Sequence, residues 1–280
     1  MPTVLRSLRK IPLFGGIIHQ MSHRILPVNE TVWAQVRSGP ARGISLQLHP
    51  RTGEIYRRGD VERLIQEVLV ERLQPGMVFY DLGANIGFFS LLAARLVGPT
   101  GRVFSFEPDA EVAARLRRNI ARNAFSNTTV VEAGIWSASK TVCFVPSDTS
   151  SPDRGTGRIA TASDKTAFVS IRCIALDDFI RTAPLPDAIK CDVEGAEVEV
   201  LFGAEQLLER RRPTIIFEIH SESNGHRVRE QLARFGYKCE TVDGNHILAV
   251  ASDERRIENR GSRIEEVAKD MVLRPEIPNH

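Results

Sequence analysis

The chain has 280 residues and no low-complexity linker, so its length favours one enzyme-sized core with additions at its ends. Its 37 basic and 35 acidic side chains leave a formal net charge of +2, which argues against a nucleic-acid-binding protein with a strongly basic face. The four cysteines lack the paired spacing of a zinc site, so we expect free, buried thiols and a cytoplasmic location.

Residues 1–53 are expected to form an N-terminal extension of a helix and a hairpin. Residues 3–24 carry four basic side chains among apolar ones and no acid, a pattern found in helices that lie on a membrane or meet a lipid-linked substrate. We favour the alternative, a helix packed on the domain, and no stretch approaches the roughly 20 apolar residues of a membrane helix. Residues 31–49 predict a hairpin, and residues 60–73 predict a helix.

The core begins near residue 78, where strand-like and helix-like segments start to alternate. Apolar strands are expected near 78–82, 103–107, 129–133, 187–192 and 214–220. Helical spacing occupies 86–97, 110–123, 196–210 and 224–235 between and after them. This order predicts an α/β fold, a doubly wound and mostly parallel sheet with helices on both faces, over residues 54–252. Residues 237–251, turning at Asp243-Gly244-Asn245, predict a closing hairpin.

Two further segments interrupt or follow this core. The strand-like runs 141–146 and 168–174 flank residues 147–165, which are rich in Ser, Thr, Asp and Gly. A polar loop of this length is usually functional or disordered, so it is either a mobile lid over the substrate or a disordered insertion. Residues 253–280 form a charged C-terminal tail, which fits a surface helix or the arm of a homodimer.

The most informative segment is the turn that follows the first core strand. Asp81 ends the strand, Gly83 allows a tight turn and close approach to a ligand, and Gly87 lets the next helix pack on the strand. Asn85 tolerates a left-handed backbone where many such loops carry glycine. A carboxylate here suits a ligand with an ammonium or sulfonium cation better than a pyrophosphate. We assign to cofactor binding Asp81, Gly83, Ala84, Asn85 and Gly87.

The second core strand also ends in acids, at Glu107-Pro108-Asp109. A carboxylate at this strand tip accepts hydrogen bonds from the two hydroxyls of a ribose, and Pro108 ends the strand because it lacks a backbone donor. We therefore assign Glu107 and Pro108 to the cofactor. The alternative is that Glu107 and Asp109 only cap the helix over 110–123.

Four motifs together resemble those of the FkbM family of class I S-adenosylmethionine-dependent methyltransferases. They are Asp-x-Gly-Ala-Asn-x-Gly-Phe-Phe-Ser at 81–90, Phe-Glu-Pro at 106–108, Leu-Asp-Asp-Phe at 176–179 and Ile-Lys-Cys-Asp-Val-Glu-Gly-Ala-Glu at 189–197. The resemblance covers about residues 54–250. It implies a Rossmann-like, seven-stranded sheet with one antiparallel strand, S-adenosylmethionine as cofactor, and methylation of a hydroxyl on a small molecule, sugar or natural product.

The catalytic candidates lie where the fourth and fifth core strands end. Methyl transfer to a hydroxyl needs an aligned, dry site and a base within about 3 Å of the leaving proton. His220 is the residue type best suited to that role near neutral pH. Lys190, Asp192, Glu194 and Glu218 are expected to bind the acceptor, lower its pKa or orient the base, and Asp192 is assigned to the cofactor as well. Glu194 has a structural alternative as a helix-terminus residue, which applies also to Glu197.

The end of the third core strand is expected to meet the adenine base. Glu132 is assigned as acceptor for its amino group, and the small Ala133 leaves room for the ring. Elsewhere, the Leu-Asp-Asp-Phe segment is expected to cap a helix. A metal cluster of Asp177, Asp178 and Asp192 is a weaker alternative, and we expect no metal site.

Three other functions remain open. Methylation of nitrogen in a protein or nucleic acid is one, although the chain has Asp192-Val-Glu-Gly where base-methylating enzymes carry Asn/Asp-Pro-Pro-Tyr/Phe. A nicotinamide oxidoreductase would use a similar glycine loop, but Asp81 disfavours a dinucleotide there. A non-catalytic subunit would bind the cofactor without turnover.

Overall fold

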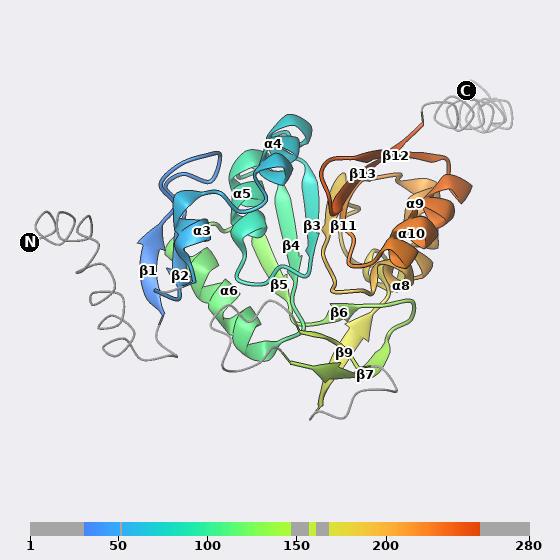
Figure 1. The fold of residues 1–280 in the computed structure, drawn as a ribbon, viewed down its shortest axis with the longest axis horizontal. Coiled ribbons are helices and arrows are strands. Elements are labelled where there is room, and N and C mark those ends of the chain that lie inside the picture. The colour runs from blue at the N-terminus through green and yellow to red at the C-terminus, as the bar shows by residue number, and fades with distance from the viewer. Residues whose placement is uncertain (1–30, 51, 147–156, 161–167, 253–280) are drawn as a thin grey trace, which may run out of the picture.

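A computed structural model describes residues 31–50, 52–146, 157–160 and 168–252 (Figure 1). The amphipathic segment 3–24, most of the expected lid over 147–165 and the tail over 253–280 lie outside the described residues. No helix among the described residues is long and apolar enough to cross a membrane.

The centre of the fold is a seven-stranded sheet in the order β12-β13-β11-β10-β3-β4-β5. The five strands from β11 to β5 run parallel, and β13 is antiparallel to both of its neighbours. The strands are β3 Val78–Leu82, β4 Arg102–Phe106, β5 Thr128–Val131, β10 Ala188–Cys191, β11 Thr214–Glu218, β12 Tyr237–Thr241 and β13 His246–Ala251. The predicted doubly wound sheet with a closing hairpin is therefore confirmed.

Helices cover both faces of this sheet (Figure 1). One face carries α3 Glu54–Arg58, α4 Arg63–Arg72, α5 Phe88–Val97 and α6 Ala110–Arg122. The other carries α7 Leu176–Phe179, α8 Glu197–Phe202, α9 Glu205–Arg210 and α10 Glu222–Arg234. Successive side chains of a strand point to opposite faces of the sheet, and each face has its own hydrophobic core. Phe79 packs into the core on one face, and Tyr80 packs into the core on the other.

The single helix predicted over 196–210 is wrong, because the chain breaks between α8 and α9. The carbonyl of Gly203 accepts a hydrogen bond from the backbone of Asp177, and a Cβ at Gly203 would lie 2.2 Å from the carbonyl oxygen of Trp136. The carboxylate of Asp177 then accepts the backbone N–H groups of Gln206 and Leu207, both at 2.9 Å. Contacts distant in sequence thus end one helix and cap the next.

The predicted N-terminal hairpin is present as β1 Val32–Gln35 and β2 Ser45–Leu48, which pair antiparallel. Helix α6 covers the edge of β2, where Asn119 and Asn123 accept the backbone N–H groups of Gln47 and Ser45. Leu46 and Leu48 join the core beneath α5, so the described part of the extension packs on the main sheet. A domain boundary at residue 53 stays a prediction.

The two strand-like runs of the insertion belong to a second sheet of four strands, which the sequence did not predict. Its order is β6-β9-β7-β8. Its members are β6 Gly134–Ile135, β7 Lys140–Val145, β8 Arg158–Ile159 and β9 Val169–Ile174. The cysteines are free as expected, but not all are buried: Cys239 is half-buried, and Cys143 is exposed on β7 because alternate residues of this small sheet face solvent.

Candidate functional site

The site lies at the carboxyl edge of the central sheet, where the chain changes direction. It winds outward from β3 through β4 to β5 and then returns to β10 on the other side of β3. Loops diverge at such a switch point and leave a crevice. A cleft with about 710 Å³ of empty space, partly open to solvent, lies there. Its lining includes six predicted cofactor residues, Gly83, Asn85, Glu107, Pro108, Ala133 and Asp192.

The glycine loop is held close to the neighbouring strands. Gly83 has φ +79°, and a Cβ at this position would lie 1.7 Å from the carbonyl oxygen of Asp192, so no other residue fits without movement of the backbone. Gly87, with φ +89°, caps α5 against the side chain of Leu116. Asn85 is left-handed, at φ +48°, as its residue type allows. The loop therefore brings its backbone up to the floor of the cleft.

Glu107 is a buried carboxylate beside this loop. Its two oxygens accept the backbone N–H groups of Asn85 and Asp109, each at 2.9 Å. Burial raises the pKa of Glu107 to about 7, against the lowering effect of these two hydrogen bonds. Asp109 caps α6 by accepting from the backbone of Glu111 and Val112. Only Asp109 fulfils the alternative role of a helix cap.

Asp81 lines a smaller cavity next to the cleft, with about 340 Å³ of empty space, and is not in the lining of the cleft itself. Ser90 donates a hydrogen bond to its carboxylate, and Ser105 donates in turn to Ser90. Burial raises the pKa of Asp81 to about 6, although Lys190 and Ser90 act in the opposite direction. The smaller cavity also takes in Ala84 and shares Asp192 with the larger cleft.

Lys190 is the buried cation at the centre of the site, with a side chain only 2% exposed. Its Nζ lies 3.1 Å from Asp192 Oδ2, 3.5 Å from Glu62 Oε2 and 4.6 Å from the centroid of the Phe89 ring. Burial by itself lowers the pKa of Lys190, but Asp192, Glu62 and Asp81 outweigh it and raise the pKa. Lys190 is therefore an ammonium group that neutralises carboxylates, and it cannot serve as the base.

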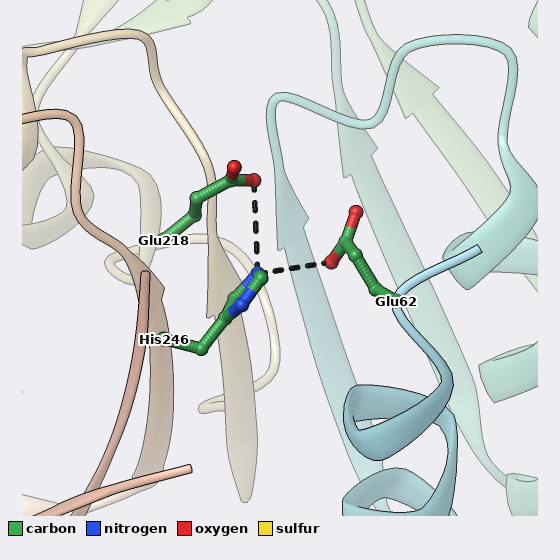
Figure 2. A group of neighbouring side chains, drawn as sticks. All are labelled: Glu62, Glu218 and His246. Atoms are coloured by element: carbon green, nitrogen blue, oxygen red, sulfur yellow. Dashed lines mark ion pairs between the residues drawn. The ribbon is translucent and has the colours of Figure 1, made fainter. Parts of the chain in front are cut away.

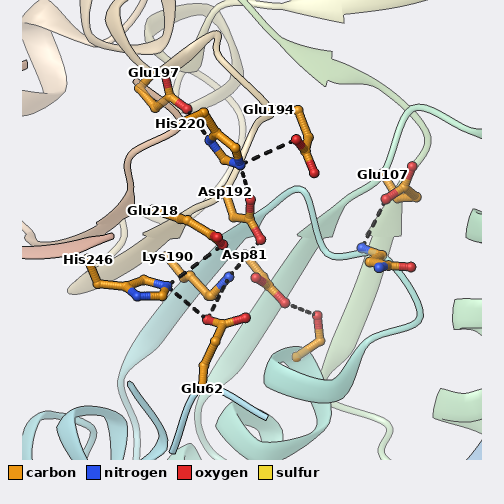
Figure 3. Close-up of polar contacts among 12 residues, drawn as sticks. Glu62, Asp81, Glu107, Lys190, Asp192, Glu194, Glu197, Glu218, His220 and His246 are labelled. Atoms are coloured by element: carbon orange, nitrogen blue, oxygen red, sulfur yellow. Dashed lines mark hydrogen bonds and ion pairs between the residues drawn. The ribbon is translucent and has the colours of Figure 1, made fainter. Parts of the chain in front are cut away.

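His220 is surrounded by three carboxylates at the end of β11 (Figure 3). Its Nδ1 lies 2.6 Å from Glu197 Oε1, and its Nε2 lies 3.3 Å from Glu194 Oε2 and 3.6 Å from Asp192 Oδ1. The hydrogen bond with Glu197 is the main reason that the pKa of His220 is raised to about 9. The structure thus brings together His220, Asp192 and Glu194, and their catalytic role stays a prediction.

Glu197 was expected as a helix-terminus residue, and the structure shows that its carboxylate also contacts His220. It is the first residue of α8 and is fully buried. Its Oε1 accepts the backbone N–H of Gly195 at 3.0 Å, and its Oε2 accepts from the side chain of Asn224 at 2.6 Å. These bonds fix the carboxylate against His220. The sequence signal that could have pointed to this role is the position of Glu197 as the second Glu of the Glu-Gly-Ala-Glu motif at 194–197.

A second histidine, His246, lies on the other side of Lys190 and was not predicted as a site residue. Its Nε2 is 3.2 Å from Glu62 Oε2 and 3.7 Å from Glu218 Oε2 (Figure 2). Its Nδ1 lies 2.8 Å from Asp243 Oδ1. Burial alone would lower the pKa of His246, but these three carboxylates raise it to about 10. Glu218, one of the predicted catalytic residues, therefore contacts His246, and it also lies within 4.8 Å, atom to atom, of Asp192 and His220.

Other candidate residues lie away from the cleft. Glu132 forms an ion pair with Arg117 at 2.9 Å and is absent from the lining of the larger cleft, so its contact with adenine stays a prediction. Asp178 accepts a hydrogen bond from Ser139, while Asp177 caps α9. Neither approaches Asp192 in the metal-ligand groupings of the described residues.

Comparisons with known proteins identify the family of the chain. A family model described as the methyltransferase FkbM domain matches residues 81–239. The hexuronic acid methyltransferase AglP of Haloferax volcanii is 31% identical over 172 residues, which cover 60% of this chain and 67% of that protein. The 31-O-demethyl-FK506 methyltransferase FkbM of Streptomyces tacrolimicus is 27% identical over 201 residues, covering 58% and 75%.

Among solved structures, the methyltransferase FkbM from Methylobacillus flagellatus KT aligns with a TM-score of 0.47 and 18% identity, covering 72% of this chain and 48% of that one. The family match, by contrast, spans more than half of the present chain and includes the glycine loop, Glu107, Lys190 and Asp192. The chain therefore belongs to the FkbM methyltransferase domain family and is an S-adenosylmethionine-dependent methyltransferase.

Proposed function

We propose that this chain transfers the methyl group of S-adenosylmethionine to a hydroxyl of a small molecule, sugar or natural product. The observation that carries the proposal is the position of His220, whose Nε2 faces Asp192 beside the cofactor cleft while its Nδ1 is held by the buried Glu197. An alcohol is a poor nucleophile until its proton is removed, so a fixed imidazole next to the methyl donor favours an oxygen acceptor.

The residues of the cleft fit the cofactor. Glu107 is buried with a raised pKa and needs hydroxyl donors to stabilise its charge, which the ribose provides. Asn85 Oδ1 is buried without a hydrogen-bond partner among the described residues. Asp81 supplies the negative charge that the cationic end of the ligand requires. When bound, the cofactor presents an electrophilic methyl group to a nucleophile.

The smaller cavity is the proposed place of the acceptor. It joins the cofactor cleft through Gly83, Asn85 and Asp192 and is lined on its other side by Glu62 and Lys190. Buried charged groups that point into a cavity bind polar ligands, such as a hydroxylated ring, better than apolar ones. The name of the relative AglP, a hexuronic acid methyltransferase, also supports a sugar as acceptor.

The proposed reaction needs His220 in its neutral form. Its Nε2 then accepts the hydroxyl proton, and Glu197 stabilises the imidazolium that results, through the contact at Nδ1. The three carboxylates favour the protonated form in the free enzyme, and a cationic cofactor opposes that effect by its own charge. With the cofactor bound in the cleft and the acceptor in the smaller cavity, water is kept away from the methyl group.

Titration calorimetry with S-adenosylhomocysteine, with NADH in parallel, tests the cofactor. A methyl-transfer assay with hydroxylated sugars and amines tests the acceptor. His220→Ala should lower turnover at least about 100-fold with cofactor affinity changed less than about twofold, while the surface variant His226→Ala should behave as wild type. Binding of NADH alone would favour an oxidoreductase, methylated amines would favour nitrogen transfer, and binding without any turnover would favour a non-catalytic subunit. Unchanged turnover in His220→Ala would remove it as the base.

A further inference from the structure

The carboxyl edge of the sheet holds a group of side chains that the proposed methyl transfer does not use. Glu62, Glu218 and His246 each direct one ligand-type atom to a common point, and these atoms lie within 4.8 Å of one another (Figure 2). They come from the start of α4, the end of β11 and the start of β13. The antiparallel register makes Glu218 and His246 direct partners across two strands.

We propose that Glu62, Glu218 and His246 form a binding site for a divalent transition-metal ion such as Mn²⁺ or Zn²⁺. Two carboxylate oxygens and one imidazole nitrogen are a common ligand set for these ions. This departs from our expectation from the sequence, which placed no metal in the protein.

The spacing of the three ligand atoms leaves room for coordination bonds of ordinary length to a single ion. His246 Nε2 lies 3.2 Å from Glu62 Oε2 and 3.7 Å from Glu218 Oε2, and the third edge is no longer than 4.8 Å. A point equidistant from the three atoms then lies no more than about 2.4 Å from each, and metal–ligand bonds measure about 2.0 to 2.6 Å. An ion therefore fits without movement of the backbone.

Two buried atoms of the group have no hydrogen-bond partner in the part of the chain that the structure describes. His246 is 5% exposed, and among the described residues neither its Nε2 nor Glu62 Oε2 has a hydrogen bond, although both atoms have charged neighbours. The two atoms lie 3.2 Å apart as an ion pair. Unsatisfied buried polar atoms are costly, so a ligand that satisfies both at once stabilises the folded protein.

The other nitrogen of His246 has the partner that metal-bound histidines usually have. Asp243 Oδ1 lies 2.8 Å from Nδ1 and also accepts the backbone N–H groups of Asn245 and His246, at 3.0 and 2.9 Å. A carboxylate at Nδ1 keeps a proton on that nitrogen, so the Nε2 lone pair becomes available to a metal once Nε2 has lost its own proton. The Asp-Gly-Asn turn therefore orients the ring toward Glu62 and Glu218.

The local charge also favours a cation. Glu62, Glu218 and Asp243 surround His246, and Asp81 and Asp192 lie on the far side of Lys190 (Figure 3). Lys190 opposes the ion, because its Nζ lies 3.5 Å from Glu62 Oε2, but it is closer to Asp192. With neutral His246, five carboxylates face one ammonium group. Without a metal, an imidazolium at His246 takes part of this role, so proton and metal compete.

The position of the site gives the ion a use, which rests on the proposed function. Glu218 also lies within 4.8 Å, atom to atom, of His220 and Asp192, and Glu62 lines the smaller cavity. An acceptor hydroxyl at an open coordination position has a lowered pKa. Its O–H bond breaks with the proton passing to His220, the new C–O bond forms, and the C–S electron pair stays on sulfur. The ion keeps its charge throughout.

The experiment uses the full chain, treated with a chelator and then titrated with MnCl₂ and ZnCl₂ by calorimetry. Electron paramagnetic resonance reports bound Mn²⁺ independently of activity. We expect one ion per chain, and at least about tenfold weaker binding in Glu62→Gln and in His246→Gln. Asp243→Asn should weaken binding about 10- to 100-fold through the ring orientation. Glu67→Gln and His226→Gln are matched exposed controls, which should bind as wild type.

Two results would overturn the proposal. One is no binding of either ion to the wild type at about 1 mM. The other is wild-type affinity in both Glu62→Gln and His246→Gln, and Glu218→Gln provides the same comparison if one of these fails to fold. Full turnover on a hydroxyl without bound metal refutes the metal's role and leaves the proposed function intact. Metal binding together with methyl transfer only to amines would refute the proposed function and leave the metal site intact.

Discussion

Cofactor binding should weaken as the pH falls, because the proposed ribose ligand Glu107 has a pKa near 7 in the free protein. The bound form requires the carboxylate, so affinity is complete above that pKa and is lost below it. Between pH 8 and pH 6 the ionised fraction of Glu107 falls from about 0.9 to about 0.1, so the affinity for the cofactor should fall about tenfold. Asp81, with a pKa of about 6, adds about twofold. The total is about twentyfold, or about 1.8 kcal/mol.

Titration calorimetry with S-adenosylhomocysteine at pH 6, 7 and 8 measures this dependence. Glu107→Gln cannot titrate, so it should bind more weakly at pH 8 and keep only the roughly twofold change that Asp81 contributes. Glu209→Gln, an exposed replacement of the same type, should reproduce the wild-type profile. Equal affinity of the wild type at pH 6 and pH 8 would refute the assignment of Glu107 as a buried ligand that must lose its proton.

Three further substitutions separate catalysis, close packing and helix capping. Glu197→Gln removes the anionic partner of His220, so turnover should fall at least about tenfold with unchanged cofactor affinity, and equal turnover would make the contact only structural. Gly83→Ala places a Cβ against the backbone of Asp192 and should lower the free energy of unfolding by about 2 to 4 kcal/mol, measured by urea denaturation; wild-type stability would contradict this close approach. Asp177→Ala should lower it by about 1 kcal/mol through the lost cap of α9 while turnover stays normal, and no loss of stability would contradict the capping role.

The sheet order could be expected from the sequence because its signals are local. Each core strand is a short apolar run, each helix follows with its own spacing, and the turn after β3 shows its glycines directly. The acids at strand ends could be recognised for the same reason, since Asp81, Glu107 and Asp192 each follow a mainly apolar run. Parallel strands end at one edge, so these side chains had to gather there.

The fold class, the family resemblance and the residues expected at the cofactor site could all be inferred from the sequence, because each rests on neighbours along the chain. Two features became visible only in the folded chain: α8 and α9 separate at Gly203, and Glu62 and His246 meet beside Lys190. Glu62 precedes the first core strand, and His246 was visible only as part of a hairpin. Their meeting depends on the pairing of β13 with β11 and on how α4 packs, and such long-range contacts leave no periodic signal in the sequence.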